Sequence, residues 1–156
     1  MKKKPLPLFV PLFIETSRSP AWRASSHGAR LLYVALKSRW QIKDDNNGRI
    51  YLSHRKAAIE LNSNKDFIGR WYRELQFYGF VVLTKHGGLG LNGKGRAAQW
   101  RLTELDFNGK PASRDFLMWD GKRFEDWHPS RQLRWLRKKQ NPVRQLTDTL
   151  SVKKGT

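Results

Sequence analysis

The stretch LNSNKDFIGRWYRELQFYGF, residues 61–80, has the spacing of an amphipathic helix with a glycine near its middle. Ile68, Tyr72 and Leu75 recur at intervals of three and four residues, which predicts one buried helix face. The opposite side carries polar and basic residues. Gly69 lies beside that basic side, although alanine would favour the helix by about 1 kcal/mol. This choice indicates a helix whose basic face comes close to another molecule.

Signals at both ends bound this helix. Ser63 is the predicted N-cap, and Asp66 three residues later completes a capping-box pattern. Gly79 suits a helix C-terminus, because glycine adopts the left-handed conformation found there. The sequence therefore predicts a helix over residues 64–78.

The residues before this helix predict three further elements. Residues 19–40 are predicted to form one long helix, with Ser19 as its cap and Pro20 at its first position. Residues 49–53 predict a short strand, and Ser53 caps a short helix after it. The predicted buried face of the long helix consists of Ala29, Leu32, Leu36 and Trp40.

The residues after it predict two strands around a loop. The β-branched run at 80–85 predicts a strand, residues 86–99 form a glycine-rich loop, and residues 100–103 alternate as a returning strand. The predicted order is helix, strand, helix, turn, helix, strand, loop, strand. This order predicts an α+β fold.

Residues 19–105 resemble the winged helix-turn-helix family. The resemblance is carried by NGRIYLSHRKAAIELNSNKDFIGRWYRELQFYGFVVL, residues 47–83, and by WRLT, residues 100–103. The chain is most similar to small phage- and plasmid-type members, including replication-initiator-like ones. The resemblance implies three helices plus a small antiparallel β-sheet with a glycine-rich wing. It also implies that helix 64–78 reads the major groove and that wing 86–99 contacts the DNA backbone or minor groove.

The charge of the chain points to a polyanionic partner. There are 31 basic and 13 acidic residues, which gives a formal net charge of +18. Residues 19–105 contain 15 of the basic and 6 of the acidic residues. Because such a charge repels itself, a nucleic acid is the expected partner, and double-stranded DNA comes first. An anionic membrane, an acidic protein and a merely solvated basic surface are the alternatives.

The predicted DNA contacts follow from side-chain chemistry. Arg70 and Arg73 can read guanine bidentately or hold phosphate, and Asn64 can read adenine. Gly69 is the predicted close-approach position, with packing against a neighbouring helix as the alternative. Further predicted contacts, mainly to phosphate, are Arg55, Lys56, Ser63, Lys65, Lys85, Lys94, Arg96, Arg131, Arg134, Arg137 and Lys138.

The glycine-rich loop allows a second interpretation. The stretch GLGLNGKG, Gly88–Gly95, fits G-x-G-x-x-G and also the first part of a P-loop that ends at Lys94. A P-loop needs Ser or Thr after that lysine, where this chain has Gly95. Both motifs also need a helix next, whereas this sequence returns to a strand. A wing is therefore favoured, and nucleotide binding through this loop is the alternative.

The two ends of the chain are predicted to lie outside the winged-helix domain. Residues 1–18 contain three prolines and predict an extended arm rather than a secretion signal. A cytoplasmic, nucleoid-associated location is therefore expected. Residues 106–140 predict an aromatic-rich extension that ends in a basic helix, and residues 141–156 a disordered tail. Residues 106–128 are expected to pack against the domain or to form a protein-contact surface. The basic helix is expected to contact the DNA backbone, with a solvated tail, a membrane surface, RNA or a protein partner as alternatives.

Signals for catalysis are weak. The chain has no cysteine, which excludes disulfides and thiolate chemistry, and its four histidines share no helical spacing. We therefore expect no enzyme activity, no cofactor and no metal site. The expected function is sequence-specific binding of double-stranded DNA, as a transcriptional regulator or a plasmid or phage replication-associated factor. A nucleotide-binding protein or an RNA- or protein-interaction module is the alternative.

Overall fold

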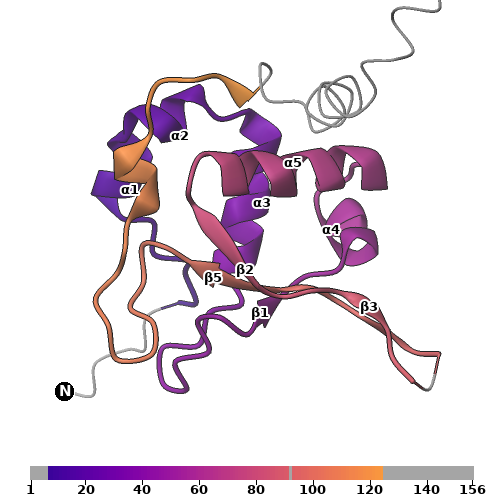
Figure 1. Ribbon diagram of the computed structural model, residues 1–156. Coiled ribbons are helices and arrows are strands. Elements are labelled where there is room, and N and C mark those ends of the chain that lie inside the picture. The colour runs from indigo at the N-terminus through magenta and orange to yellow at the C-terminus, as the bar shows by residue number, and fades with distance from the viewer. Residues whose placement is uncertain (1–6, 92, 125–156) are drawn as a thin grey trace, which may run out of the picture. The chain divides into compact units, whose positions relative to one another are not determined.

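The computed structural model describes residues 7–91 and 93–124 (Figure 1). Every helix and strand of the described residues lies in the compact unit of residues 1–122. All but two residues of the second unit, 123–156, fall outside the described ranges. The domain end predicted at residue 105 falls within the first unit. The elements in chain order are α1 (Ile14–Arg18), α2 (Pro20–Ala24), α3 (His27–Lys37), β1 (Ile50–Tyr51), α4 (His54–Glu60), α5 (Lys65–Phe77), β2 (Val81–Lys85), β3 (Gly88–Leu89), β4 (Gly95–Arg96), β5 (Gln99–Leu102) and the 3₁₀ helix η1 (Asp115–Met118).

The structure confirms an α+β fold but corrects the number of helices. The described residues contain five α-helices, because α1 forms within the predicted extended arm and the predicted helix 19–40 is divided. Ser19 caps α2 with Pro20 at its start, as predicted. The chain then becomes extended at Ser25, and Ser26 caps α3 by accepting a hydrogen bond from the Ala29 N–H. Hydroxyl side chains that bond the backbone compete with helix continuation, which explains the break.

The N-terminus of α3 has a second capping contact, from a residue far along the sequence. The Glu74 carboxylate of α5 accepts hydrogen bonds from the backbone N–H of Ser26, at 2.5 Å, and from its hydroxyl, at 2.8 Å. Glu74 is only 4% exposed. Its charge is therefore satisfied by donors at the N-terminus of α3, where a negative charge is also favoured by the helix dipole.

The start of α5 differs from its prediction by one residue. Asn64, and not Ser63, is the N-cap, since its side-chain oxygen accepts the N–H of Phe67 at 2.9 Å. The predicted capping box is therefore wrong. Ser53 caps α4 as predicted, by accepting the N–H of Lys56 at 3.2 Å.

The three-stranded sheet is antiparallel with β5 in the middle, in the order β1-β5-β2. Ile50 and Val81 are buried at the positions that face Trp100 and Leu102 across β5, while α3 and α5 lie on this face of the sheet (Figure 1). The pairing of β2 with β5 contains a one-residue irregularity. Leu83 pairs with Trp100, and Lys85 then pairs with Gln99. Such a bulge changes the direction of the strand and of the side chains after it.

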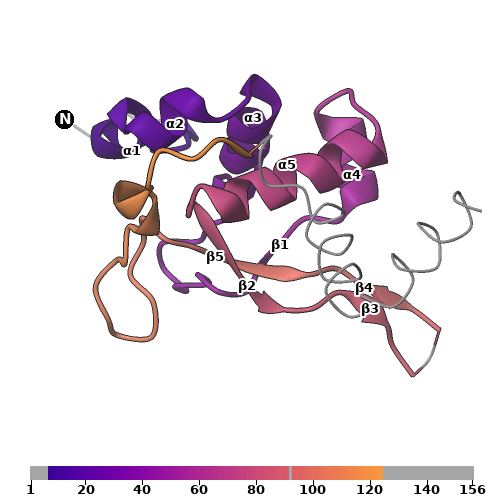
Figure 2. The ribbon, with the colours of Figure 1, turned by 45° about the horizontal axis from the view of Figure 1, so that its top comes forward.

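The residues predicted to form a wing contain a two-stranded hairpin. β3 and β4 pair antiparallel, with Gly88 opposite Arg96 and Leu89 opposite Gly95. They extend beyond the three-stranded sheet on the side away from α1 and α2 (Figure 2). A β-strand, not a helix, follows the glycine-rich sequence. This geometry lacks the helix N-terminus that a P-loop or a dinucleotide-binding turn places at the phosphates.

Aromatic side chains make up much of the core, and one of them comes from the segment after β5. Phe80 stacks on Phe116 of η1, with ring centroids 5.2 Å apart, and also meets Trp22 edge-on at 5.5 Å. Phe116 is 1% exposed, and the carbonyl of Thr103 accepts the N–H of Arg114. Phe116, which lies in the predicted extension, is thus part of the same core.

A buried polar cluster connects α1, α3 and the end of β5. The Glu104 carboxylate forms an ion pair with Lys37 and accepts a hydrogen bond from the Thr16 hydroxyl at 2.5 Å. Burial lowers the pKa of Lys37, and Glu104 opposes this effect. Burial and then the nearby charge of Glu104 raise the pKa of Tyr33 well above its usual range. Breaking a buried pair of this kind is costly, because one charge remains without a partner.

Replacing Glu74 with Gln tests the connection between α5 and α3. The variant loses a charge that accepts two hydrogen bonds at a helix N-terminus, so the free energy of unfolding should fall by about 1.5–3 kcal/mol. Glu60→Gln is the matched control, because Glu60 forms a partly exposed ion pair with Arg39 and should cost less than about 1 kcal/mol. Urea unfolding curves measure both changes. Equal losses for the two variants would contradict the role assigned to Glu74.

Candidate nucleic-acid interface

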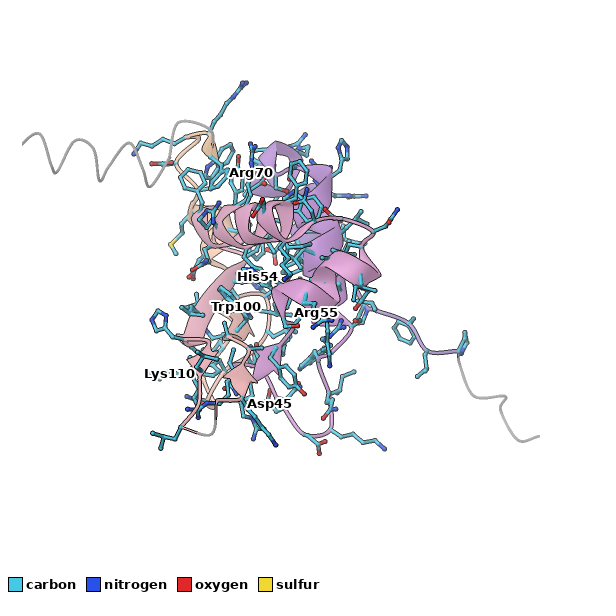
Figure 3. All side chains as sticks on the ribbon, turned by 90° about the vertical axis from the view of Figure 1, so that its right-hand side faces the viewer. Asp45, His54, Arg55, Arg70, Trp100 and Lys110 are labelled. Carbon is cyan, nitrogen blue, oxygen red and sulfur yellow. The ribbon has the colours of Figure 1, made fainter. Side chains whose placement is uncertain are left out.

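The solvent-facing side of α5 carries most of its charged residues. Lys65, Asp66, Arg70 and Arg73 are exposed. The predicted apolar face, Ile68, Tyr72 and Leu75, is buried as expected, with none of the three more than 2% exposed. Figure 3 shows Arg70 on α5 and, at the start of α4, His54 and Arg55.

Gly69 lies between this exposed face and the first residue of α4. A Cβ atom at position 69 would come no closer than 3.6 Å to Arg73 and 3.7 Å to His54, both of which are ordinary van der Waals distances. A side chain at position 69 would thus contact the start of α4 without a clash, and these distances do not decide between close approach to a ligand and packing against α4. The surface beside Gly69 has room for one methyl group.

The glycine that helix packing does require is Gly28, which sequence reasoning missed. A Cβ atom at position 28 of α3 would lie 2.0 Å from the indole ring of Trp71 on α5. The ring thus occupies the space that a side chain on α3 would need. Together with Glu74, this contact fixes how α5 is rotated on α3. Gly28 and Trp71 are both visible in the sequence, but no local pattern indicates that these two distant residues are in contact.

A stack of three rings supports the start of α4. The rings of His54 and Tyr72 are 5.1 Å apart, and those of Tyr72 and Trp100 are 4.8 Å apart, both nearly parallel. The Tyr72 hydroxyl donates a 2.6 Å hydrogen bond to the carbonyl of Leu52. Burial and then the positive charge of Arg73 lower the pKa of His54 below its usual 6.5. His54 therefore lies beside the exposed face of α5, next to Gly69 and Arg73.

The predicted polar contacts at the start of α5 are not equally available. The side-chain oxygen of Asn64 already accepts the N–H of Phe67. Bidentate reading of adenine needs this oxygen together with the amide nitrogen. Lys65, one residue later, is exposed and forms no ion pair with another described residue. Phosphate contact by Lys65 is therefore easier to satisfy than adenine recognition by Asn64.

The structure separates the predicted basic residues into two groups. Lys56, Lys85 and Arg96 line a cavity of about 420 Å³ at the base of the wing. Arg96 also lines a groove of about 370 Å³ that His54 and Tyr72 border. The second group lies on α5 and consists of Lys65, Arg70 and Arg73, with Gly69 between them. Arg55 is exposed on α4, and Lys94 is exposed in the β3–β4 turn.

The remaining predicted contacts cannot be placed. Arg131, Arg134, Arg137 and Lys138 lie outside the described residues, as does the basic helix predicted for 129–140.

Comparisons with protein-family models, with curated proteins and with solved structures gave no match. Among helices of the described residues, none has the length and apolar character needed to cross a bilayer. Within residues 7–91 and 93–124, no three histidine or carboxylate side chains gather as a metal site would require. The case for a function therefore depends on geometry and charge.

Alanine substitutions at Gly69 and at Gly28 are expected to have opposite effects on the free energy of unfolding. Gly69→Ala should raise the free energy of unfolding by up to about 1 kcal/mol, because the methyl group meets only ordinary contacts. Gly28→Ala should lower it by about 1–3 kcal/mol, because the Trp71 ring must move. Thermal unfolding followed by circular dichroism measures both.

A double-mutant cycle provides the control. In a Trp71→Ala background, Gly28→Ala should lose most of its effect, since the clash is gone. A Gly69→Ala protein that melts below the wild type would contradict the open environment assigned to position 69.

Proposed function

We propose that the chain is a sequence-specific double-stranded DNA-binding protein of the winged helix-turn-helix class. The observation that carries the proposal is an arrangement: α4 and α5 are joined by a short turn beside a basic hairpin, on a sheet of order β1-β5-β2. A formal charge of +18 supports it. Its cellular role would be that of a transcriptional regulator or a plasmid or phage replication-associated factor.

In this proposal α5 enters the major groove. Arg73 and Arg70 are the candidates for reading guanine, because a guanidinium can donate to both acceptors on its major-groove edge. Lys65 near the helix N-terminus contacts phosphate and sets the register. The missing side chain at Gly69 lets base edges approach the helix between Arg73 and His54.

The wing is proposed to hold the flanking backbone. Lys94 and Arg96 place positive charge on a narrow two-stranded hairpin, which can follow a phosphate strand or enter a minor groove. Arg55, at the exposed start of α4, adds a phosphate contact. These contacts give affinity and orientation, whereas sequence preference comes from α5.

The first experiment selects preferred sites from a random duplex pool and measures affinity against salt. The logarithm of affinity should fall steeply with the logarithm of salt concentration, because each phosphate contact releases counterions. The enriched sequences should share a short motif. Binding that is absent or independent of salt would overturn the proposal, and salt-dependent binding without a shared motif would remove its sequence specificity.

Arg73→Ala should relax the preference at one base step and lower affinity for the selected site by about 1–3 kcal/mol if Arg73 reads a base. Arg23→Ala is the matched control, because it removes the same charge from the exposed surface of α2. Electrophoretic mobility shifts on the selected site and on single-base variants measure both. A uniform loss over all sequences with a shallower salt slope would assign Arg73 to phosphate instead.

DNA binding should strengthen as pH falls from about 7.5 to 5.5. The pKa of His54 is depressed in the free protein by burial and by Arg73, and a nearby phosphate would raise it again, so binding takes up a proton. A difference of one pKa unit between the free and bound states corresponds to about a tenfold change in affinity.

His54→Gln should remove this pH dependence. The same depressed pKa implies that folding stability is present above about pH 6.5 and declines as pH falls below it. Unfolding curves at each pH therefore accompany the binding measurements. An unchanged pH profile in His54→Gln would exclude His54 from the interface.

A further inference from the structure

The outer face of the sheet carries a cavity that major-groove reading by α5 does not use. Tyr51, Gln99 and Lys85 occupy matching positions on β1, β5 and β2, because both Tyr51 and Lys85 pair with Gln99. The neighbouring residues on these strands, Ile50 and Trp100, are buried on the helix side. The three side chains therefore form the floor of a cavity of about 420 Å³ on the opposite side.

An exposed aromatic ring forms part of this floor. Tyr51 is 58% exposed, although it lies in a strand whose flanking residues are buried. The alternation of Ile50, Tyr51 and Leu52 along a strand accounts for this outward position. An exposed ring beside basic side chains is the surface on which unpaired bases stack.

The walls of the cavity are positively charged. Lys56 comes from α4, Arg96 from β4, and His86 follows β2, while the lining contains no carboxylate. None of Lys56, Lys85 and Arg96 forms an ion pair with another described residue. Glu60, one turn beyond Lys56 on α4, is paired with Arg39 instead. The cavity is therefore suited to an anion.

The size of the cavity favours a ligand larger than a phosphate group alone. Its volume lies within the range of about 300–1,000 Å³ that is usual for small-molecule sites. An inorganic phosphate bound by the cations would leave the Tyr51 ring and the Gln99 amide without a partner. A nucleoside phosphate uses all three features: the base stacks on the ring, the amide bonds a base or sugar edge, and the cations hold the phosphate.

We propose that this cavity binds a nucleoside phosphate, either free or as an unpaired residue of a nucleic-acid strand. The base stacks on Tyr51, and Lys56, Lys85 and Arg96 bind the phosphate. Arg96 also borders the groove near His54, so a strand held in the cavity can continue along the wing. The site goes beyond duplex recognition and does not require it.

The test measures three ligands by equilibrium binding: a twelve-residue oligothymidylate, deoxyadenosine monophosphate and a twenty-base-pair duplex. Tyr51→Ala should weaken binding of the single strand about five- to a hundredfold, as expected for the loss of base stacking. Tyr51→Phe, which keeps the ring, should bind like the wild type. Ala97→Trp, which fills the cavity and keeps every cation, should weaken binding as Tyr51→Ala does.

Controls separate this site from the α5 surface. Phe9→Ala removes an exposed ring elsewhere and should change nothing. Arg73→Ala should weaken duplex binding and leave single-strand binding unchanged, whereas Tyr51→Ala should do the reverse. If the wild type binds the single strand but not the duplex, the proposed function fails and the cavity proposal stands.

Comparison of the two nucleotide ligands also shows whether the site takes a free nucleotide or an unpaired residue of a strand. Competition by deoxyadenosine monophosphate supports a free nucleotide, and binding of the oligonucleotide alone supports a strand. The proposal is overturned if Tyr51→Ala and Ala97→Trp bind the single strand like the wild type. It is also overturned if inorganic phosphate competes as well as the nucleotide, or if the wild type binds neither ligand. Thermal unfolding confirms that each variant is folded.

Discussion

The Glu74 carboxylate joins two helices that are separated by almost fifty residues of sequence. It belongs to α5, yet it completes the N-terminus of α3 by accepting both donors of Ser26. A buried carboxylate is stable only where donors surround it, so α5 has one favourable position along α3. The Trp71 ring against Gly28 then sets the rotation of α5. Which residues of α5 face the solvent, and therefore any ligand, is a consequence of these two contacts.

The same contacts explain why part of the fold was predictable and part was not. The buried face of α5, the caps of α2 and α4, and the strands at β1, β2 and β5 follow from local periodicity and capping chemistry, and the structure has them where the sequence placed them. The break between α2 and α3 was missed, because Ser25 and Ser26 lie within a pattern that continues as a helix. The partner that stabilises the break, Glu74, is distant in sequence.

The candidate site shows a similar division. Sequence reasoning identified the basic residues, since charge is visible without a structure, but it treated them as one surface. The structure places Lys56, Lys85 and Arg96 around a cavity at the wing base and leaves Arg73 with Gly69 and His54. His54 and Tyr51 were not selected, because their roles depend on neighbours from other strands and helices. Asn64 was selected for a base contact, yet its oxygen serves the helix.

The bulge in β2 determines on which face Lys85 lies. In a regular ladder continued from Leu83 and Trp100, the next pair would join Thr84 to Gln99, and Lys85 would return to the buried side with Leu83. The extra residue places Lys85 opposite Gln99 and beside Tyr51, while Thr84 donates a hydrogen bond to the carbonyl of Gly48. One inserted residue thus converts an inward position into an outward one for the strand that leads into the wing. With the same residues in a regular ladder, Lys85 would face the buried side, so the bulge is as necessary to the basic cavity as the charges themselves.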